Sequence, residues 1–381
     1  MRRRRAREED GSAEIRRTGG GVTRRDLVKI GALGAVGLAS AGSSMALARP
    51  SRQESPNGAA PPHGGHGPNE TVGTLRPGGL DPMAFLTHFD TGELSVLPSG
   101  QPLREYSLVA VDREIEVAPG VFFPGWTYNG QVPGPTLRCT EGDRVRMRFQ
   151  NAGTHPHTIH FHGIHPADMD GVFEVVEPGG SFTYEFDAEP FGVQLYHCHA
   201  TPLKRHLHKG LYGMFLIDPK AGRPPARELV MVMNGFDTNF DGENEVYAVN
   251  TVAFHYQHHP IRIETDELVR VYVANLTEFD PINSFHLHGN FYKLFRTGTN
   301  LEHYEYTDNV MLCQAERCII EFEYKYPGRF MFHAHQSEFA ELGWMGIFDV
   351  VRPTVAGADA AHAVPHTNAS ARTASPEHVH G

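Results

Sequence analysis

Four short motifs contain two histidines separated by one residue. Side chains at positions i and i+2 of an extended strand point to the same face, so each motif presents two imidazoles side by side. Neutral imidazole is a common ligand of copper, zinc and iron. One such pair alone fits a polar strand face, but four pairs at related positions predict a metal cluster, because eight protonated rings facing one another would repel. The eight residues are His160, His162, His197, His199, His286, His288, His333 and His335.

A cysteine lies inside one of these motifs. Cys198 separates His197 from His199, so on an extended strand its sulfur points to the opposite face from the two rings. A thiolate together with two histidines is the ligand set of a blue copper site. The segment therefore predicts two metal sites on opposite sides of one strand, joined by a covalent route for electrons.

The remaining ligands of the blue copper site are predicted from spacing. His157 has the position of the first histidine and His206 that of the second, while Leu211 falls at the axial position, where it would not coordinate and would raise the reduction potential. Two alternatives stay open. His208 could replace His206, and Met214 could supply an axial sulfur, although its position in an expected core strand favours packing.

The motifs belong to an internal repeat. HTIHFHG at residues 157–163 aligns with NSFHLHG at residues 283–289, and FGVQLYHCHA at residues 191–200 aligns with PGRFMFHAHQ at residues 327–336. The second copy keeps its four histidines but lacks the blue copper ligands. At the positions of His157, Cys198, His206 and Leu211 it has Asn283, Ala334, Phe339 and Trp344. We therefore expect two copies of one domain in tandem, with the site of electron entry only in the first copy.

The intervening sequence predicts strands. Short runs rich in Val, Phe, Tyr and Ile alternate with Gly, Pro and Asp turns, and no helical period persists, which indicates an all-β protein. We expect the two domains at residues 96–222 and 223–353. Residues 49–95 and the histidine-containing tail at 354–381 are rich in small and polar residues, and both are expected to be flexible or disordered.

The first 48 residues are typical of an export signal. Thr23-Arg24-Arg25-Asp26-Leu27 resembles a twin-arginine motif, and an uncharged segment then ends in Ala46-Leu47-Ala48. We therefore expect a periplasmic or extracellular protein without a membrane anchor. Removing this segment takes away ten of 34 basic and five of 45 acidic residues, which leaves a net charge near −16. Such an acidic protein is a poor candidate for binding nucleic acid.

The motifs together resemble the two-domain, laccase-like multicopper oxidases. The resemblance implies two tandem cupredoxin-like Greek-key β-sandwich domains and four coppers per chain: one type 1 (blue) copper, one type 2 and two type 3. It implies a homotrimer with the clusters between subunits. It also places Asp170, and less clearly Glu338, near the cluster as proton donors. By the same resemblance, His160 and His286 would bind type 2 copper, and His162, His197, His199, His288, His333 and His335 would bind type 3 copper.

The implied activity is one-electron oxidation of a reducing substrate, with a phenol as the expected class, coupled to four-electron reduction of dioxygen to water. A copper-containing nitrite reductase is the alternative enzyme, although those enzymes generally have Asp at the position of His160 and no second imidazole at that of His199. A non-catalytic electron-transfer protein is the other alternative. Cys313 and Cys318 could form a disulfide after export or remain as two buried thiols.

Overall fold

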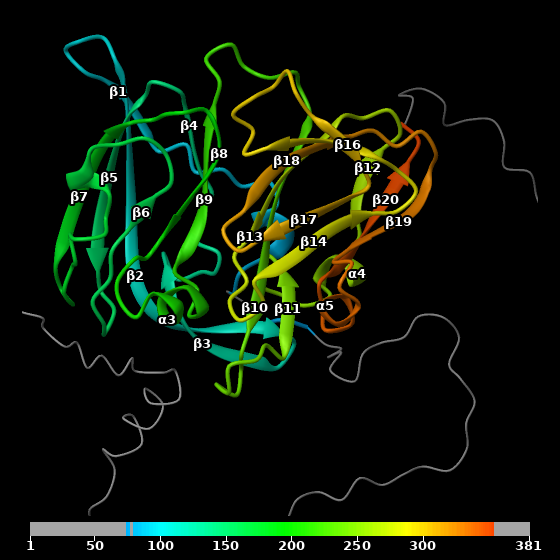
Figure 1. Cartoon of the computed structure of the whole chain (residues 1–381), viewed down its shortest axis with the longest axis horizontal. Helices are drawn as coiled ribbons and strands as arrows, with labels where there is room; N and C mark the ends of the chain where they lie inside the picture. The colour runs from blue at the N-terminus through cyan, green and yellow to red at the C-terminus, as the bar shows by residue number, and fades with distance from the viewer. Residues whose placement is uncertain (1–73, 77–78, 354–381) are drawn as a thin grey trace, which may run out of the picture. The chain divides into compact units, whose positions relative to one another are not determined.

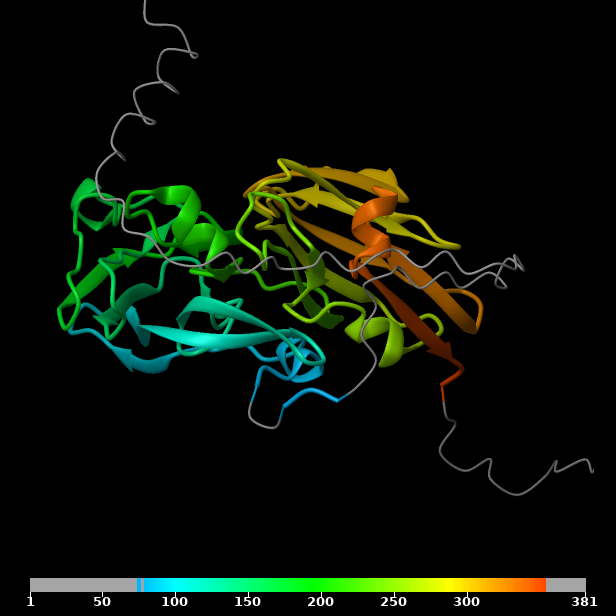
Figure 2. The ribbon, with the colours of Figure 1, turned by 90° about the horizontal axis from the view of Figure 1, so that it is seen from below.

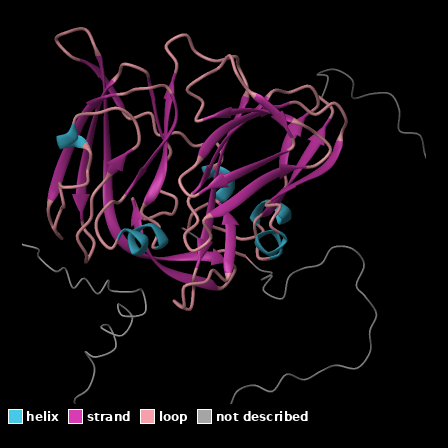
Figure 3. Cartoon of the chain, in the orientation of Figure 1, coloured by secondary structure: helices cyan, strands magenta, loops and turns pink. Residues whose placement is uncertain are grey.

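The computed structural model describes residues 74–76 and 79–353 of the 381-residue chain (Figure 1). The predicted signal peptide at 1–48 and the predicted tail at 354–381 lie outside the described residues. Strands dominate the described part and the helices are short (Figure 3). The prediction of an all-β protein is therefore confirmed. No helix within the described residues is long and apolar enough to cross a membrane.

The first domain consists of two sheets. One has the strand order β1-β2-β5-β7, with β3 paired to β2, and the other has the order β4-β9-β8-β6. The strands are β1 (Glu93–Val96), β2 (Pro102–Ala118), β3 (Val121–Tyr128), β4 (Leu137–Thr140), β5 (Arg144–Asn151), β6 (His160–Phe161), β7 (Ser181–Asp187), β8 (Gly192–His197) and β9 (Tyr212–Asp218). The short helices η1 (Ala167–Met169) and α3 (Leu203–His208) lie in its connections.

The second domain also has two sheets, with the orders β11-β10-β13-β18-β15-β16 and β12-β20-β19-β14-β17. In both domains the strands lie in two facing layers (Figures 1 and 2). The elements are β10 (Arg227–Phe236), β11 (Val246–Val249), α4 (His255–His258), β12 (Ile261–Glu264), β13 (Val269–Asn275), β14 (Ile282–Leu287), β15 (Tyr292–Arg296), β16 (Glu305–Thr307), β17 (Asn309–Cys313), β18 (Arg317–Phe322), β19 (Gly328–His333), α5 (Ser337–Glu341) and β20 (Met345–Val351).

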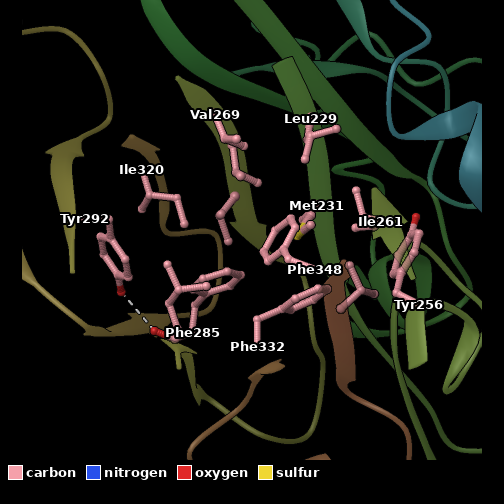
Figure 4. Packing of buried hydrophobic residues seen from close by; sticks show 14 of the residues in the cluster. Leu229, Met231, Tyr256, Ile261, Val269, Phe285, Tyr292, Ile320, Phe332 and Phe348 are labelled. Atoms are coloured by element: carbon pink, nitrogen blue, oxygen red, sulfur yellow. Dashed lines mark hydrogen bonds between the residues drawn. The ribbon is translucent and has the colours of Figure 1, made fainter. Parts of the chain in front are cut away.

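Each sandwich encloses its own hydrophobic core. In β5 the side chains of Val145, Met147 and Phe149 are buried and alternate with more exposed positions, the period expected for a strand with one face on a core. The core of the second domain is rich in aromatic rings. Phe285 and Phe332 stack at 5.7 Å, and the Tyr292 hydroxyl donates to the Phe285 carbonyl at 2.9 Å (Figure 4).

A third apolar cluster joins the two domains. Strand β9 is buried on both faces: Phe215 belongs to the core of the first domain, while Met214 packs in a cluster with residues of the second domain such as Val232. Beside it, Arg138 on β4 pairs with Glu228 on β10 at 2.6 Å. A hydrophobic interface of this kind holds the two domains in a fixed relation, because sliding would expose it to water.

The segment that precedes the first domain packs against the second. Helix α2 (Pro82–Phe85) begins after Asp81, whose side chain accepts hydrogen bonds from two helix N–H groups. Leu86 lies in the core cluster of the second domain, and the Tyr256 hydroxyl donates to the Pro82 carbonyl at 2.7 Å. The segment expected to be flexible, residues 49–95, thus includes α2 and β1 as regular elements.

Candidate metal centres

The end of strand β8, helix α3 and the segment before β6 bring one sulfur and two imidazoles together. Cys198 Sγ lies 3.1 Å from His206 Nδ1 and 4.0 Å from His157 Nδ1, and the two nitrogens are 3.3 Å apart. All three side chains are buried. The Cys198 N–H donates to the Leu211 carbonyl at 2.9 Å, which fixes the loop between α3 and β9 against the site. Three donor atoms of blue copper type therefore converge as predicted.

The electrostatics of this group suit a metal cation. Burial lowers the pKa of His157 and of His206 to about 4, so both rings are neutral and can donate a lone pair. Burial raises the pKa of the Cys198 thiol, while the Thr158 N–H at 3.4 Å from Sγ favours the thiolate. A buried thiolate needs a compensating positive charge, which copper would supply.

The structure separates the two alternative ligands from this site. His208 Nε2 accepts a hydrogen bond from the Asp237 N–H at 3.3 Å, and its ring contacts Phe123 and Phe279. Met214 packs in the cluster between the domains, whereas Leu211 lies in the same core cluster as Cys198. His206 is accordingly the histidine that the fold places at the sulfur, and Leu211 shares the core cluster of Cys198.

The first histidine cluster lies on the opposite side of Cys198. His160 on β6 pairs in register with His197 on β8, and the Nε2 atoms of His162 and His197 face each other at 3.1 Å. The His199 ring lies 5.5 Å from the His160 ring. Burial and the neighbouring His197 lower the pKa of His162 to about 3. The lone pairs of two facing Nε2 atoms on neutral rings repel each other, whereas a metal ion bound between them would accept both.

The second domain repeats this arrangement. His286 on β14 pairs with His333 on β19, the Nε2 atoms of His288 and His333 are 2.9 Å apart, and the His335 ring lies 5.3 Å from His286. His288 and His335 are exposed. We call the four histidines of each domain a half-site. Within the described residues, no group of three potential ligands draws on both domains.

In each half-site, backbone carbonyls fix the orientation of two histidine rings. A carbonyl only accepts, so the ring nitrogen facing it carries the proton, and the opposite nitrogen, Nε2, keeps its lone pair for a metal. In the first half-site, His160 Nδ1 donates to the Asp170 carbonyl and His197 Nδ1 to the Cys198 carbonyl, at 2.8 and 3.0 Å. In the second, His286 Nδ1 donates to the Asp308 carbonyl at 2.9 Å and His333 Nδ1 to the Ala334 carbonyl at 2.6 Å.

An acidic residue adjoins each half-site. Asp170 Oδ1 lies 3.1 Å from His160 Nδ1, and Asp308 Oδ2 lies 3.8 Å from His286 Nδ1. Gly171 has φ +72°, and a Cβ there would overlap the Ile159 carbonyl, so glycine allows the backbone to place Asp170. The sequence hypothesis missed Asp308, which follows His286 at a different spacing from that between His160 and Asp170.

Glu338 is placed differently from Asp170. It is exposed in the first turn of α5, and no hydrogen bond or ion pair joins its carboxylate to a half-site histidine in the part of the chain that the structure describes. Cys313 is exposed on β17, and Cys318 is buried in the core on β18. Both are free thiols. Only one of the two is buried, so neither of the two states considered from sequence describes them.

The second domain keeps two backbone hydrogen bonds of the blue copper loop without its ligands, in a loop three residues shorter. The Ala334 N–H donates to the Trp344 carbonyl, and the Trp344 N–H donates to the Phe339 carbonyl, just as Cys198 and Leu211 bond in the first domain. Trp344 is fully buried. A fully buried indole, packed against Phe285 and Phe332, thus stands in the second domain at the position of Leu211.

Comparisons with known proteins agree with this geometry. Two family models, both described as multicopper oxidase, match residues 112–222 and 223–353. A crystal structure of a multicopper oxidase is 56% identical and covers 72% of this chain and 98% of its own, with a TM-score of 0.71. Blue copper oxidase from Nitrosomonas europaea is 28% identical, over 65% of this chain and 86% of its own, with a TM-score of 0.59.

One similar protein is named as a nitrite reductase and not as an oxidase. Copper-containing nitrite reductase from Neisseria gonorrhoeae is 28% identical over 246 residues, which cover 59% of this chain and 62% of that protein. The chain therefore spans less than two thirds of the length of the curated relatives that it matches first.

The paired sandwiches and the cysteine–histidine site define a copper protein built from cupredoxin-like domains. The family matches and the 56% identical structure narrow this class further. The chain belongs to the multicopper oxidase family, a family of copper oxidoreductases, and has a type 1-like site in its first domain.

Proposed function

We propose that the protein is a laccase-like oxidase that removes single electrons from a reducing substrate, a phenol being the expected class, and reduces dioxygen to water. The observation that carries this proposal is the composition of the half-sites. Both consist of histidines, with facing Nε2 atoms at 3.1 Å in one and 2.9 Å in the other. Eight imidazoles suit a cluster of several coppers, whereas a single catalytic copper requires fewer ligands.

The residues have distinct tasks in this reaction. Cys198 holds the entry site with His157 and His206, and its neighbours His197 and His199 belong to the half-site, so three consecutive residues connect both centres. Bound copper would supply the redox chemistry by cycling between its cuprous and cupric states. Asp170 lies beside His160 and is the proposed source of protons for the reduced oxygen.

We further propose that the complete cluster forms between chains, in a closed homotrimer. Each half-site is partly exposed, and exposed apolar side chains lie near its histidines in the sequence: Ile164 and Phe173 in the first domain, Ile282 and Met311 in the second. Surfaces of this kind are typical of interfaces. A head-to-tail ring would bring the first half-site of one chain to the second half-site of the next. In this assembly His160 and His286 would bind type 2 copper.

The ligands of the type 3 coppers and the cellular location of the protein belong to the same proposal. The type 3 pair would take His162, His197 and His199 from one chain and His288, His333 and His335 from the next. The mature protein would act in the periplasm or outside the cell, after twin-arginine export.

Copper content, oxygen uptake and nitrite reduction test the proposal together. An oxidase binds about four coppers per chain and consumes about one dioxygen for every four electrons taken from a phenol. The similarity to nitrite reductases makes nitrite the necessary competing acceptor. Nitric oxide formation from nitrite without oxygen uptake would refute dioxygen reduction, and a single blue copper with neither activity would indicate an electron carrier.

A further inference from the structure

The type 1-like site exposes very little of its ligands to a donor. Cys198 and His157 are fully buried, and His206 is 3% exposed. Electron transfer weakens steeply as the gap between donor and acceptor widens, so a group packed against these ligands would enlarge the surface from which a donor can couple to them. One side chain contacts both histidines directly.

That side chain is the indole of Trp126, at the end of β3. Its ring centroid lies 4.9 Å from the His206 ring and 5.4 Å from the His157 ring, both in edge-on orientation. Its backbone N–H donates to the Lys209 carbonyl at 2.8 Å, which ties β3 to the end of α3. Trp126 is itself 5% exposed, so it forms the layer next to the ligands.

Two polar side chains form the next layer outward. The partly exposed His155 ring packs on Trp126 at 4.4 Å and 37°, and its Nδ1 lies 2.9 Å from Thr154 Oγ1, which fixes its orientation. Arg205 is exposed on α3, with its guanidinium 5.1 Å from the centre of the indole. Exposure thus increases from the ligands through Trp126 to His155 and Arg205.

We propose that Trp126 is the electron-entry residue of this protein. The donor docks on the surface formed by His155 and Arg205, and its electron crosses the indole to His157 and His206. The donor loses one electron, the type 1 site gains it, and no bond forms or breaks in the indole. This inference rests on the proposed function only for the presence of a reducible type 1 centre, and it does not depend on the final acceptor.

The charges around the ring favour a bridging role. The Arg205 guanidinium and the Lys209 ammonium, 5.9 Å from the ring centre, both disfavour loss of an electron from the indole. The ring therefore couples donor and ligands without being oxidised itself. The same positive charge on an otherwise acidic protein attracts donors that carry negative charge, such as phenolates.

The test is anaerobic reduction of the blue absorption band of the copper-loaded protein by hydroquinone, followed by stopped flow. Oxygen is absent, so the rate reports electron entry alone. The variants are Trp126→Phe, which keeps an aromatic ring, and Trp126→Leu, which keeps only apolar bulk. The control is Trp344→Phe, which alters the other tryptophan at the repeat-related position of Leu211. The reduction potential and the position of the blue band are measured for every variant.

We expect the second-order rate to fall about tenfold in Trp126→Leu, less in Trp126→Phe and not at all in Trp344→Phe, with the potential unchanged. Equal rates in wild type and Trp126→Leu would overturn the inference. A rate loss fully accounted for by a shifted potential would overturn it too, because Trp126 would then only shield the site. Failure of the proposed function has a different signature, since the wild type would reduce normally but consume no oxygen.

Discussion

Protonation of the buried half-site histidine His197 offers a quantitative test of the metal-site interpretation. His197 is 7% exposed, and burial, with smaller effects of His160 and His199, lowers its pKa to about 4. In the unfolded chain the value is about 6.5. As pH falls below 6.5, the unfolded chain of the copper-free protein binds this proton before the folded chain does. The stability contribution is therefore complete above pH 6.5 and is lost as pH falls towards 4.

The magnitude follows from the two pKa values. One pKa unit corresponds to about 1.4 kcal/mol, and the linkage relation gives a loss of about 2 kcal/mol for His197 between pH 7.5 and pH 5. The assay is urea unfolding of the copper-free protein at several pH values, for the wild type and for His197→Gln, which does not titrate. We expect the stability of the wild type to fall more steeply, by about 2 kcal/mol over this range.

Parallel curves for the two proteins would refute this reasoning, because they would show that His197 has the same pKa in both states. The copper-loaded wild type is the matched control. A metal ligand must be unprotonated, so bound copper opposes protonation and the loaded protein should keep its stability to a lower pH than the copper-free protein.

Three further predictions concern other parts of the chain. Leu211→Met should keep the fold, since the exchange conserves volume, and should lower the type 1 potential by about 60 mV or more, a tenfold change in the preference for the oxidised metal, measured by redox titration. An unchanged potential would mean that the axial position lies elsewhere. Gly171→Ala should displace Asp170 and reduce oxygen consumption about tenfold while anaerobic reduction of the blue band stays normal; loss of both would point to misfolding. Arg138→Leu should destabilise the protein by about 2–3 kcal/mol in urea unfolding, because it leaves Glu228 partly buried with less positive charge, and a loss below 0.5 kcal/mol would contradict this role of the pair.

Much of the type 1-like site was predictable because it depends on local periodicity. Alternation along β8 sends Cys198 one way and His197 the other, and this needs only an extended backbone. The choice between His206 and His208 was less secure, because both lie in helix α3. Residues two apart on a helix are rotated by about 200° around its axis and so point to nearly opposite sides. Only one of the two histidines can therefore face the sulfur.

Other features depend on contacts between distant segments and left no signal in the sequence. Asp308 reaches His286 through the pairing of β14 with β17, not through a motif. Strands β4 and β5 separate Trp126 from His157 in the sequence, and the contact between the two rings appears only once β3 is tied to α3. The docking of Leu86 into the core of the second domain is likewise a long-range contact that composition could not indicate.

The buried indole of Trp344 bears on how such proteins can change. The second domain retains two backbone hydrogen bonds of the loop around the mononuclear site, but this loop is three residues shorter there and carries none of the ligands. Building a second mononuclear site there would require changes at four side chains, Asn283, Ala334, Phe339 and Trp344, and a loop longer by three residues.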